Sequence, residues 1–344
     1  MLNRLSFLTV TIIASTAAAG IILTPLLAPQ AAWAKPKESC LYVNDSGVTK
    51  QAKSMSQVPS RFRQNAKCFA EGQSQFLAAP DQIDLKGSIR EENITSPIGK
   101  ISLRWPRSAE EYFGRTPLRA TIEAARAVSR AIKRSSIPSD VQRLSLDWKI
   151  VFMDAAMPSN QVPTQLITNC HPGWMTPPAN IYVVAQRIAG GCFGGRSSTS
   201  VADNELSEVL VHEMGHAVEY YLLKGNGGVD RQRAEGFATW FEEFAARSSS
   251  LLDASEIKSK QYSLAKDSFR RSPDSFSFSG DAFDYARASM YFHAIEARFG
   301  TDSVMAVYKN MAETGIPFSQ AVEESLGLNS QALDHEVKKL VLGK

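Results

Sequence analysis

The sequence contains little histidine and little cysteine, with 5 His and 4 Cys among 344 residues. No two cysteines have the Cys-x-x-Cys spacing of zinc ribbons or dithiol redox sites. The net charge is only +3, and the basic residues form no stripe interleaved with aromatics, so we expect no nucleic-acid partner. Hydrophobic residues make up 44% and charged residues 21%, which is typical of an ordinary globular chain.

A long apolar run occupies the amino-terminal end. Arg4 gives a positive start, residues 5 to 27 are apolar, and the Ala-Trp-Ala of residues 32 to 34 fits a small-x-small cleavage site. The pattern predicts a secretory signal over residues 1–34 and a secreted or periplasmic protein of a bacterial envelope. The run approaches membrane-spanning length, so an uncleaved anchor is the alternative, and a membrane would be a partner only in that case.

The four cysteines suit an oxidising compartment, because their number is even and none has metal-site spacing. Four cysteines allow three connectivities. We favour Cys40 with Cys68 and Cys170 with Cys192, because each pair brackets a compact segment with turn signals inside it.

The most informative stretch is His-Glu-Met-Gly-His at residues 212–216. On a helix, His212 and His216 lie about 40° apart on one face, so both imidazoles can reach a single metal ion. Glu213 projects beside them, where it could activate a water without being a ligand. An apolar stripe at helical spacing supports the helix and lies away from the histidines. We expect Ser200 or Asp203 to cap the helix and the glycines from 225 onward to end it.

A third ligand follows 19 residues after His216, at Glu235. Around it, one helical face carries Phe237, Trp240, Phe241 and Phe244. The opposite face carries Glu235, Thr239 and Glu242. Two His and one Glu would leave a tetrahedral zinc site with an open position. The alternative for Glu235 is a solvent-facing carboxylate.

The His-Glu-x-x-His pattern, followed by Glu-Gly-Phe-Ala-Thr-Trp at residues 235–240, resembles the gluzincin metallopeptidases and especially the peptidase MA-like group. The resemblance covers roughly residues 100–340. It implies an α+β, zincin-like fold, Zn²⁺ on His212, His216 and Glu235, and Glu213 as general base and later proton shuttle. Metzincins are excluded, because their pattern requires Gly and His where this chain has Glu219 and Leu222.

The sequence departs from the family at the residue that orients a zinc-bound histidine. Many gluzincins place an acid four residues after the ligand glutamate, where this chain has Thr239. Glu242 is a candidate for this role, and a solvated surface carboxylate is the alternative. Further along, the family match implies that Tyr285 donates a hydrogen bond to the oxyanion of the tetrahedral intermediate, with His293 as the rival donor and an ordinary buried tyrosine as the alternative.

Breakers and hydrophobic patterns divide the chain into a signal (1–34), a small disulfide-pinned amino-terminal module with its linker (35–95) and a catalytic domain (96–344). In the module we expect a hairpin near residues 41–49 and a helix near 60–69, and we place the linker at 78–97. In the catalytic domain we expect strands at 101–105, 146–153 and 180–186, a helix at 116–135 and closing helices to residue 340.

Two loop and edge assignments bear on the substrate. In the family an edge strand beside the zinc cleft takes an extended peptide by strand addition, and residues 180–186 are our candidate for it. A buried central strand is the alternative. His171 is predicted as a surface histidine, with a place at the cleft as the alternative, and His335 as a surface residue.

Together these features predict a zinc-dependent peptidase that hydrolyses peptide or protein substrates. A zinc-retaining envelope scaffold without activity is one alternative, and the intact Glu213 speaks against it. A second alternative is an amide hydrolase that acts on cell-wall crosslinks, which the sequence does not separate from a peptidase.

Overall fold

The computed structural model describes residues 38–43, 49–52, 55–65, 67–70, 80–113, 117–153, 171–190, 202–225, 230–273 and 276–343. The predicted signal segment lies outside these residues, as do Cys170 and Cys192. Within the described ranges, no helix is both long and apolar enough to cross a bilayer.

A small antiparallel sheet forms the amino-terminal module, with strand order β2-β1-β3. The predicted hairpin is confirmed as β1 (Glu38–Val43) and β2 (Thr49–Ala52). The predicted helix is wrong in its second half: a 3-10 turn at Ser60–Asn65 is followed by β3 (Lys67–Ala70), which pairs with β1. That register sets Cys40 opposite Cys68, but their side chains are not among those described, so the disulfide stays a prediction.

A five-stranded mixed sheet follows in the chain, in the order β4-β5-β6-β8-β7. β4 (Ile89–Ser96) and β5 (Gly99–Pro106) form an antiparallel hairpin, and β5, β6 (Leu146–Met153) and β8 (Asn180–Val184) run parallel. The linker predicted at 78–97 is therefore wrong over β4. The polar sequence there has a simple cause, since no side chain of this edge strand is fully buried.

The predicted edge strand proves to be an interior strand. β8 lies between β6 and β7, and four of its five residues are buried. The buried-strand alternative therefore holds. The strand also ends at Val184, because Ala185–Gly190 forms the short helix α4. The true edge is β7 (Gly173–Thr176), which runs antiparallel to β8.

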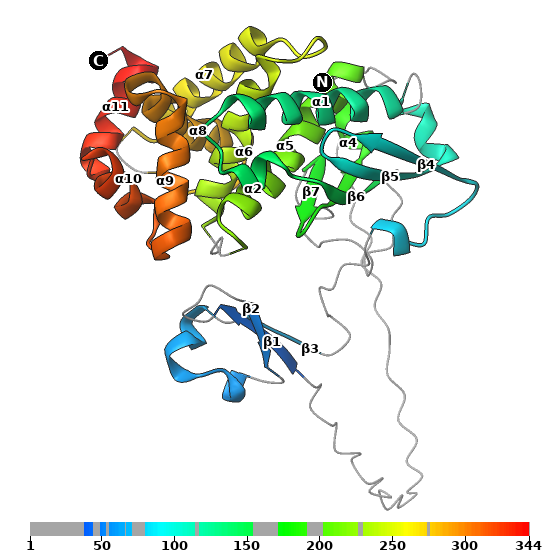
Figure 1. Ribbon diagram of the computed structural model, residues 1–344, viewed down its shortest axis with the longest axis horizontal. Helices are drawn as coiled ribbons and strands as arrows, with labels where there is room; N and C mark the ends of the chain where they lie inside the picture. The colour runs from blue at the N-terminus through cyan, green and yellow to red at the C-terminus, as the bar shows by residue number, and fades with distance from the viewer. Residues whose placement is uncertain are drawn as a thin grey trace, which may run out of the picture. The chain divides into compact units, whose positions relative to one another are not determined.

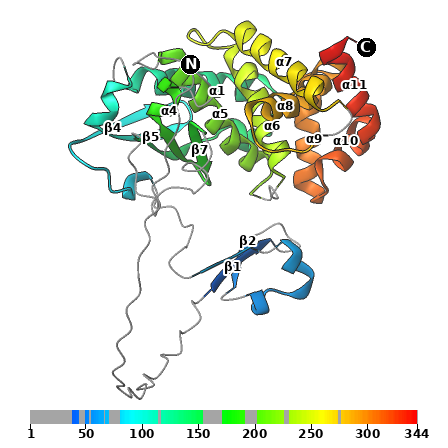
Figure 2. The same cartoon turned by 180° about the vertical axis from the view of Figure 1, so that it is seen from behind.

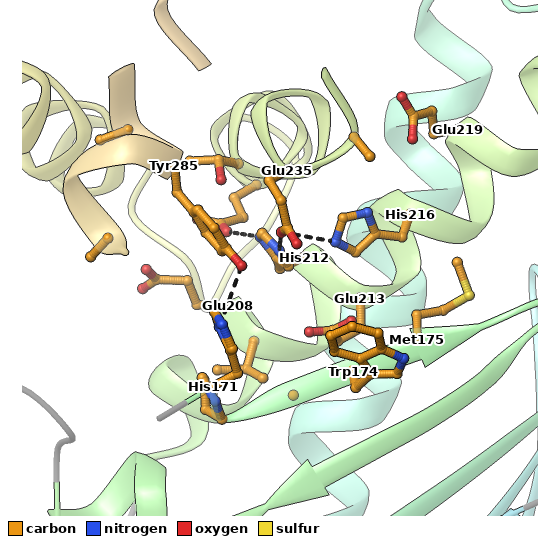
Figure 3. A pocket seen from close by; sticks show the side chains of 18 of the residues that line it. His171, Trp174, Met175, Glu208, His212, Glu213, His216, Glu219, Glu235 and Tyr285 are labelled. Carbon is orange, nitrogen blue, oxygen red and sulfur yellow. Dashed lines mark hydrogen bonds and ion pairs between the residues drawn. The ribbon is translucent and has the colours of Figure 1, made fainter. Parts of the chain in front are cut away.

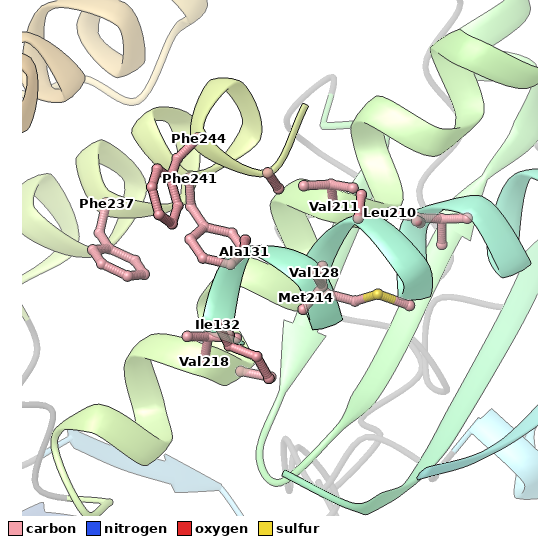
Figure 4. Packing of buried hydrophobic residues seen from close by; sticks show 14 of the residues in the cluster. Val128, Ala131, Ile132, Leu210, Val211, Met214, Val218, Phe237, Phe241 and Phe244 are labelled. Atoms are coloured by element: carbon pink, nitrogen blue, oxygen red, sulfur yellow. The ribbon is translucent and has the colours of Figure 1, made fainter. Parts of the chain in front are cut away.

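Three helices enclose the main core beside the sheet: α1 (Leu118–Arg134), α5 (Asp203–Leu222) and α6 (Arg231–Ala246). In Figure 4, Val128 and Ile132 of α1 meet Met214 and Val218 of α5, and the phenyl rings of α6 lie next to them. All four of these aliphatic side chains are almost fully buried. The short segments around the core are η3 (Pro80–Gln82), η4 (Arg107–Glu111) and α2 (Ser139–Gln142).

The remaining helices are α7 (Ala254–Arg271), α8 (Ala282–Phe299), α9 (Thr301–Thr314), α10 (Phe318–Leu326) and α11 (Ser330–Leu342). Figures 1 and 2 show α9 to α11 at the end of this domain away from β4, with α5, α6 and α8 between. The α+β class and the closing helices are thus confirmed, including the Asn329 cap, whose side chain accepts from the Ala332 N–H. His335 is exposed, as predicted.

Candidate metal centre

Helix α5 carries the two histidines and is fixed on both sides. Its first helical residue is Asp203, and Ala202 is the cap, so the predicted caps are wrong: the Glu205 carboxylate accepts from the Ala202 N–H at 3.2 Å instead. The predicted apolar stripe is confirmed, since Leu206, Leu210 and Met214 are at most 2% exposed. Burial of that stripe leaves the opposite face of the helix for the histidines.

Helix α6 carries Glu235, the potential acidic ligand, and packs against α5. Asp230 caps it by accepting from the Arg233 N–H at 3.0 Å. Gly215 of α5 permits the close approach, because a Cβ there would lie 3.2 Å from the Phe241 ring and 3.4 Å from the Ala238 Cα. The two helices therefore place side chains from different segments within reach of one another.

The imidazoles of His212 and His216 converge on the Glu235 carboxylate. Each Nε2 lies 3.3 Å from the same Oε2 of Glu235, and the three potential ligand atoms lie within 4.8 Å of one another. Figure 3 shows the three side chains meeting between α5 and α6. Two imidazoles and one carboxylate fit a zinc ion with a fourth position left for water or substrate. The predicted grouping is confirmed as a candidate metal site, and the identity of the metal stays a prediction.

Glu235 is the anionic member of this group, and a metal ion that bound the two imidazoles would displace protons from them. Burial alone would raise the pKa of Glu235, but His216 and His212 hold the pKa of its carboxyl well below the usual range. Burial alone would lower the pKa of His212, yet its hydrogen bonds to Glu235 and Glu242 raise it well above the usual value. An ionised Glu235 is the form that a metal ion would bind.

Glu242 contacts His212 on the ring nitrogen that faces away from Glu235. Its Oε1 lies 2.5 Å from His212 Nδ1, and the residue is only 9% exposed. The contact directs Nε2 of the same ring toward the candidate metal position. The predicted contact is confirmed over the solvated alternative. Thr239 stands where many gluzincins carry an acid, and its hydroxyl has no hydrogen-bond partner within the described part of the chain.

Glu213 faces the cleft beside the edge strand. Burial raises the pKa of its carboxyl to about 7, and His212 and His216 act against that rise. A Cβ on Gly173 of β7 would lie only 2.6 Å from Glu213 Oε1. In Figure 3, Glu213 lies next to Trp174 and Met175 of this strand. The missing side chain at 173 is what leaves room for the carboxylate.

Tyr285 lies on the other side of the candidate metal position. Its ring is parallel to that of His212, with 6.1 Å between centroids, and its hydroxyl lies 3.3 Å from His171 Nδ1. Burial, with Glu235 nearby, raises the pKa of its phenol well above the usual value, so the hydroxyl keeps its proton. His171 therefore belongs to the cleft, and its prediction as a surface residue is wrong.

His293, the rival donor, does not line the cleft. It is 3% exposed and its Nε2 lies 3.0 Å from Gln261 Oε1. Tyr285 is thus the donor of the two that reaches the cleft.

A cavity of about 480 Å³ surrounds the candidate metal position. It lies between β7, α5, α6, α7 and α8, and its lining includes the three potential ligands, Glu213 and Tyr285. Arg231 and Gly173 are two lining residues with a role in this site that the sequence analysis did not identify. Arg231 stands four residues before Glu235, a helical spacing that could have revealed it, whereas nothing in the sequence marks Gly173.

A second group of potential ligands, Glu243, His293 and Glu296, lies within the described residues. There the Arg247 guanidinium forms ion pairs with both carboxylates. Trp240 and Thr301 also donate to Glu296, at 3.1 and 2.7 Å. An arginine already provides the positive charge at this place, so we assign no metal to it.

No family model matches this chain, and no curated protein is similar enough to be matched with it. The chemistry therefore has to be read from the residues themselves.

Proposed function

We propose that this protein is a zinc-dependent peptidase. The supporting observation is the approach of His212 Nε2 and His216 Nε2 to one oxygen of Glu235, with the Glu213 carboxylate next to them in the same cavity. His212, His216 and Glu235 would hold the ion. When bound, zinc would polarise a substrate carbonyl and lower the pKa of a water toward neutrality.

Glu213 is the general base in this proposal. A carboxyl with a pKa of about 7 can accept a proton from the attacking water and then release it to the leaving amine. The carboxylate is kept at the cleft by Gly173, which leaves no side chain in its place. Tyr285 would donate a hydrogen bond from its hydroxyl to the substrate oxygen that becomes negative in the transition state.

The substrate backbone would align along β7. Within the described sheet this strand pairs on one side only, with β8, so its other edge can receive an extended peptide by strand addition. The same strand borders the cavity with Gly173, Trp174 and Met175. A peptide bound there would have its backbone next to Glu213.

The test compares purified wild type with Glu213→Gln on a denatured protein substrate, with bound zinc measured for both. We expect equal zinc in the two proteins and cleavage by wild type alone, because Glu213 is a base and not a ligand. Zinc without cleavage by wild type would instead support the scaffold alternative. Release of amine from cell-wall crosslinks, without peptide cleavage, would support the amide hydrolase.

The location also remains a proposal, and it rests on the sequence. The signal-like residues 1–34 support export, so we propose that the protein acts in the periplasm or outside the cell. Sequencing the amino terminus of the mature protein tests this proposal, and we expect it to begin at Lys35.

A further inference from the structure

Three strongly basic side chains line the cavity: Arg231, Arg233 and Lys260. Two of them have a carboxylate at short distance. Lys260 Nζ lies 2.6 Å from Glu208 Oε1, and Arg233 Nε lies 2.9 Å from Glu219 Oε1. These two cations are neutralised by the protein itself.

Arg231 differs from both. Among the described residues its ion pair is with Glu235, and there the Nε to Oε1 distance is 3.6 Å, too long for a hydrogen bond. Its closer partners are neutral: Nη2 lies 3.2 Å from the Tyr285 hydroxyl and 3.3 Å from His171 Nε2. Its Nε is buried without any hydrogen-bond partner in the described residues.

The Arg231 guanidinium is confined by its surroundings. Its Cζ lies 5.7 Å from the centre of the Phe278 ring. A Cβ on Gly280 would lie 2.9 Å from its Nη2, so the main chain approaches closely on that side. The side chain remains 37% exposed and borders the cavity. A confined guanidinium loses little conformational freedom when it binds an anion.

Metal binding would leave this cation less compensated. Glu235, its anionic partner within the described part of the chain, is the carboxylate that the proposed zinc ion would bind. The other two contacts are a phenol hydroxyl and an imidazole nitrogen, and neither is a carboxylate. A carboxylate can use two guanidinium N–H groups at once, which makes it the natural ligand for such a site.

We propose that Arg231 binds a carboxylate of the substrate next to the cleaved bond, and that the protein therefore prefers anionic peptides. The proposal rests on the peptidase function proposed above, since it names the substrate class of that same cleft. The carboxylate is either the free carboxyl terminus of a short peptide or an Asp or Glu side chain. Both sources offer the same bidentate anion.

The competing role for Arg231 is to position Tyr285 through the 3.2 Å contact. The two roles predict different patterns. A positioning arginine affects acidic and neutral peptides alike, whereas a carboxylate-binding arginine affects only the acidic ones.

The experiment uses the zinc-loaded, full-length Glu213→Gln protein, so that peptides bind without being cleaved. Three probes are titrated by calorimetry: acetyl-Leu-Leu with a free carboxyl terminus, acetyl-Leu-Leu amide and acetyl-Leu-Glu amide. This Glu213→Gln parent is compared with three proteins that each carry one further substitution: Arg231→Gln, Arg231→Lys or Arg126→Gln. Arg126 is the matched control, because it loses the same charge from the exposed face of α1.

We expect at least one of the two carboxylates to bind about tenfold or more tightly than the neutral amide, as a charge-assisted hydrogen bond predicts. The ratio of the Kd of the neutral amide to that of the carboxylate should fall to about one in Arg231→Gln. It should fall only in part in Arg231→Lys and stay unchanged in Arg126→Gln. Direct contact of the carboxylate with zinc is common to all four proteins and cancels when the ratios are compared. Preference for the free terminus or for the Glu side chain identifies the source of the carboxylate.

The proposal is overturned if the parent protein binds all three probes equally, or if Arg231→Gln weakens them all by the same factor. Because the readout is binding, it is independent of turnover. An Arg231-dependent preference in a protein whose wild type cleaves nothing would contradict the peptidase and leave the carboxylate site standing.

Discussion

The Nδ1 of His212 lies 2.5 Å from the Oε1 of Glu242, which is three positions further along α6 than the family pattern would place an orienting acid. Each of the two side chains is only 12% exposed, so the contact is largely shielded from water. Because Glu242 contacts the ring nitrogen of His212 that does not face Glu235, it would act on a metal ion through this histidine and not on the substrate.

We therefore expect Glu242→Gln to lower zinc affinity by about 10-fold to 100-fold, the usual cost of losing such an orienting partner. Competition with a chelator of known affinity measures it. Thr239→Val is the matched control and should retain wild-type affinity, because its hydroxyl orients nothing in the described structure. The reverse ranking of the two variants would assign the orienting role to position 239.

Gly173→Ala tests the placement of the base. The added Cβ would lie 2.6 Å from Glu213 Oε1, and the backbone at 173 has no positive φ, so the main effect is to displace the carboxylate. We expect kcat to fall by about 100-fold or more, in the range lost when a general base is misplaced, while bound zinc stays the same. Thr176→Ser on the same strand should leave kcat near wild type. Unchanged kcat in Gly173→Ala would show that Glu213 does not need its present position.

Tyr285→Phe tests the oxyanion donor. Loss of one such donor lowers kcat by about 100-fold to 1,000-fold. We expect this loss with little change in KM, because the bond forms mainly in the transition state. Tyr220→Phe, which removes a hydroxyl from another residue of the cavity lining, should have little effect. If both substitutions lower kcat equally, Tyr285 has no special role.

The buried imidazole of His293 should make the free energy of unfolding depend on pH. Burial lowers the pKa of this imidazole from 6.5 to about 3, opposed by Glu296 and supported by Lys258 and Arg247. The ring donates Nε2–H to Gln261 Oε1, an oxygen whose identity follows from the bond of Gln261 Nε2 to the Thr239 carbonyl at 2.6 Å. Between these two pKa values, the unfolded chain binds a proton that the folded chain does not.

His293 should therefore contribute a loss of about 1.4 kcal/mol in unfolding free energy for each pH unit as pH falls from about 6.5 toward 3. In His293→Gln the unfolding free energy should fall less steeply between pH 6.5 and 4.5, by about 1.4 kcal/mol for each pH unit. Chemical denaturation of zinc-loaded protein measures it. His335→Gln, at an exposed position, should keep the wild-type slope. Parallel profiles for wild type and His293→Gln would contradict the buried, neutral ring.

The sequence predicted the helix faces correctly, because they follow from residues that repeat at helical spacing. Leu206, Leu210 and Met214 repeat at helical spacing, so the burial of one face of α5 follows directly, and the face left over carries the histidines. The spacing from His216 to Glu235 allowed for a turn and a returning helix, which is how α5 and α6 are arranged. The candidate metal site follows from these two local patterns.

Strand order was not predictable in this way. A run such as Asn180–Val184 looks the same whether it lies at an edge or in the interior, because the difference depends on a partner elsewhere in the chain. The true edge, Gly173–Thr176, has four residues between prolines and reads as a loop. Arg231 was missed for a similar reason, since its importance depends on Tyr285 and His171, which come from other elements.

The metal position itself offers the most direct test. Crystals of the purified protein, measured on both sides of the zinc absorption edge, would give an anomalous peak at any bound zinc. We predict one strong peak about 2.0 to 2.2 Å from His212 Nε2, His216 Nε2 and a carboxylate oxygen of Glu235. No peak at these atoms after zinc has been added, or a peak with Glu235 turned away, would contradict the account.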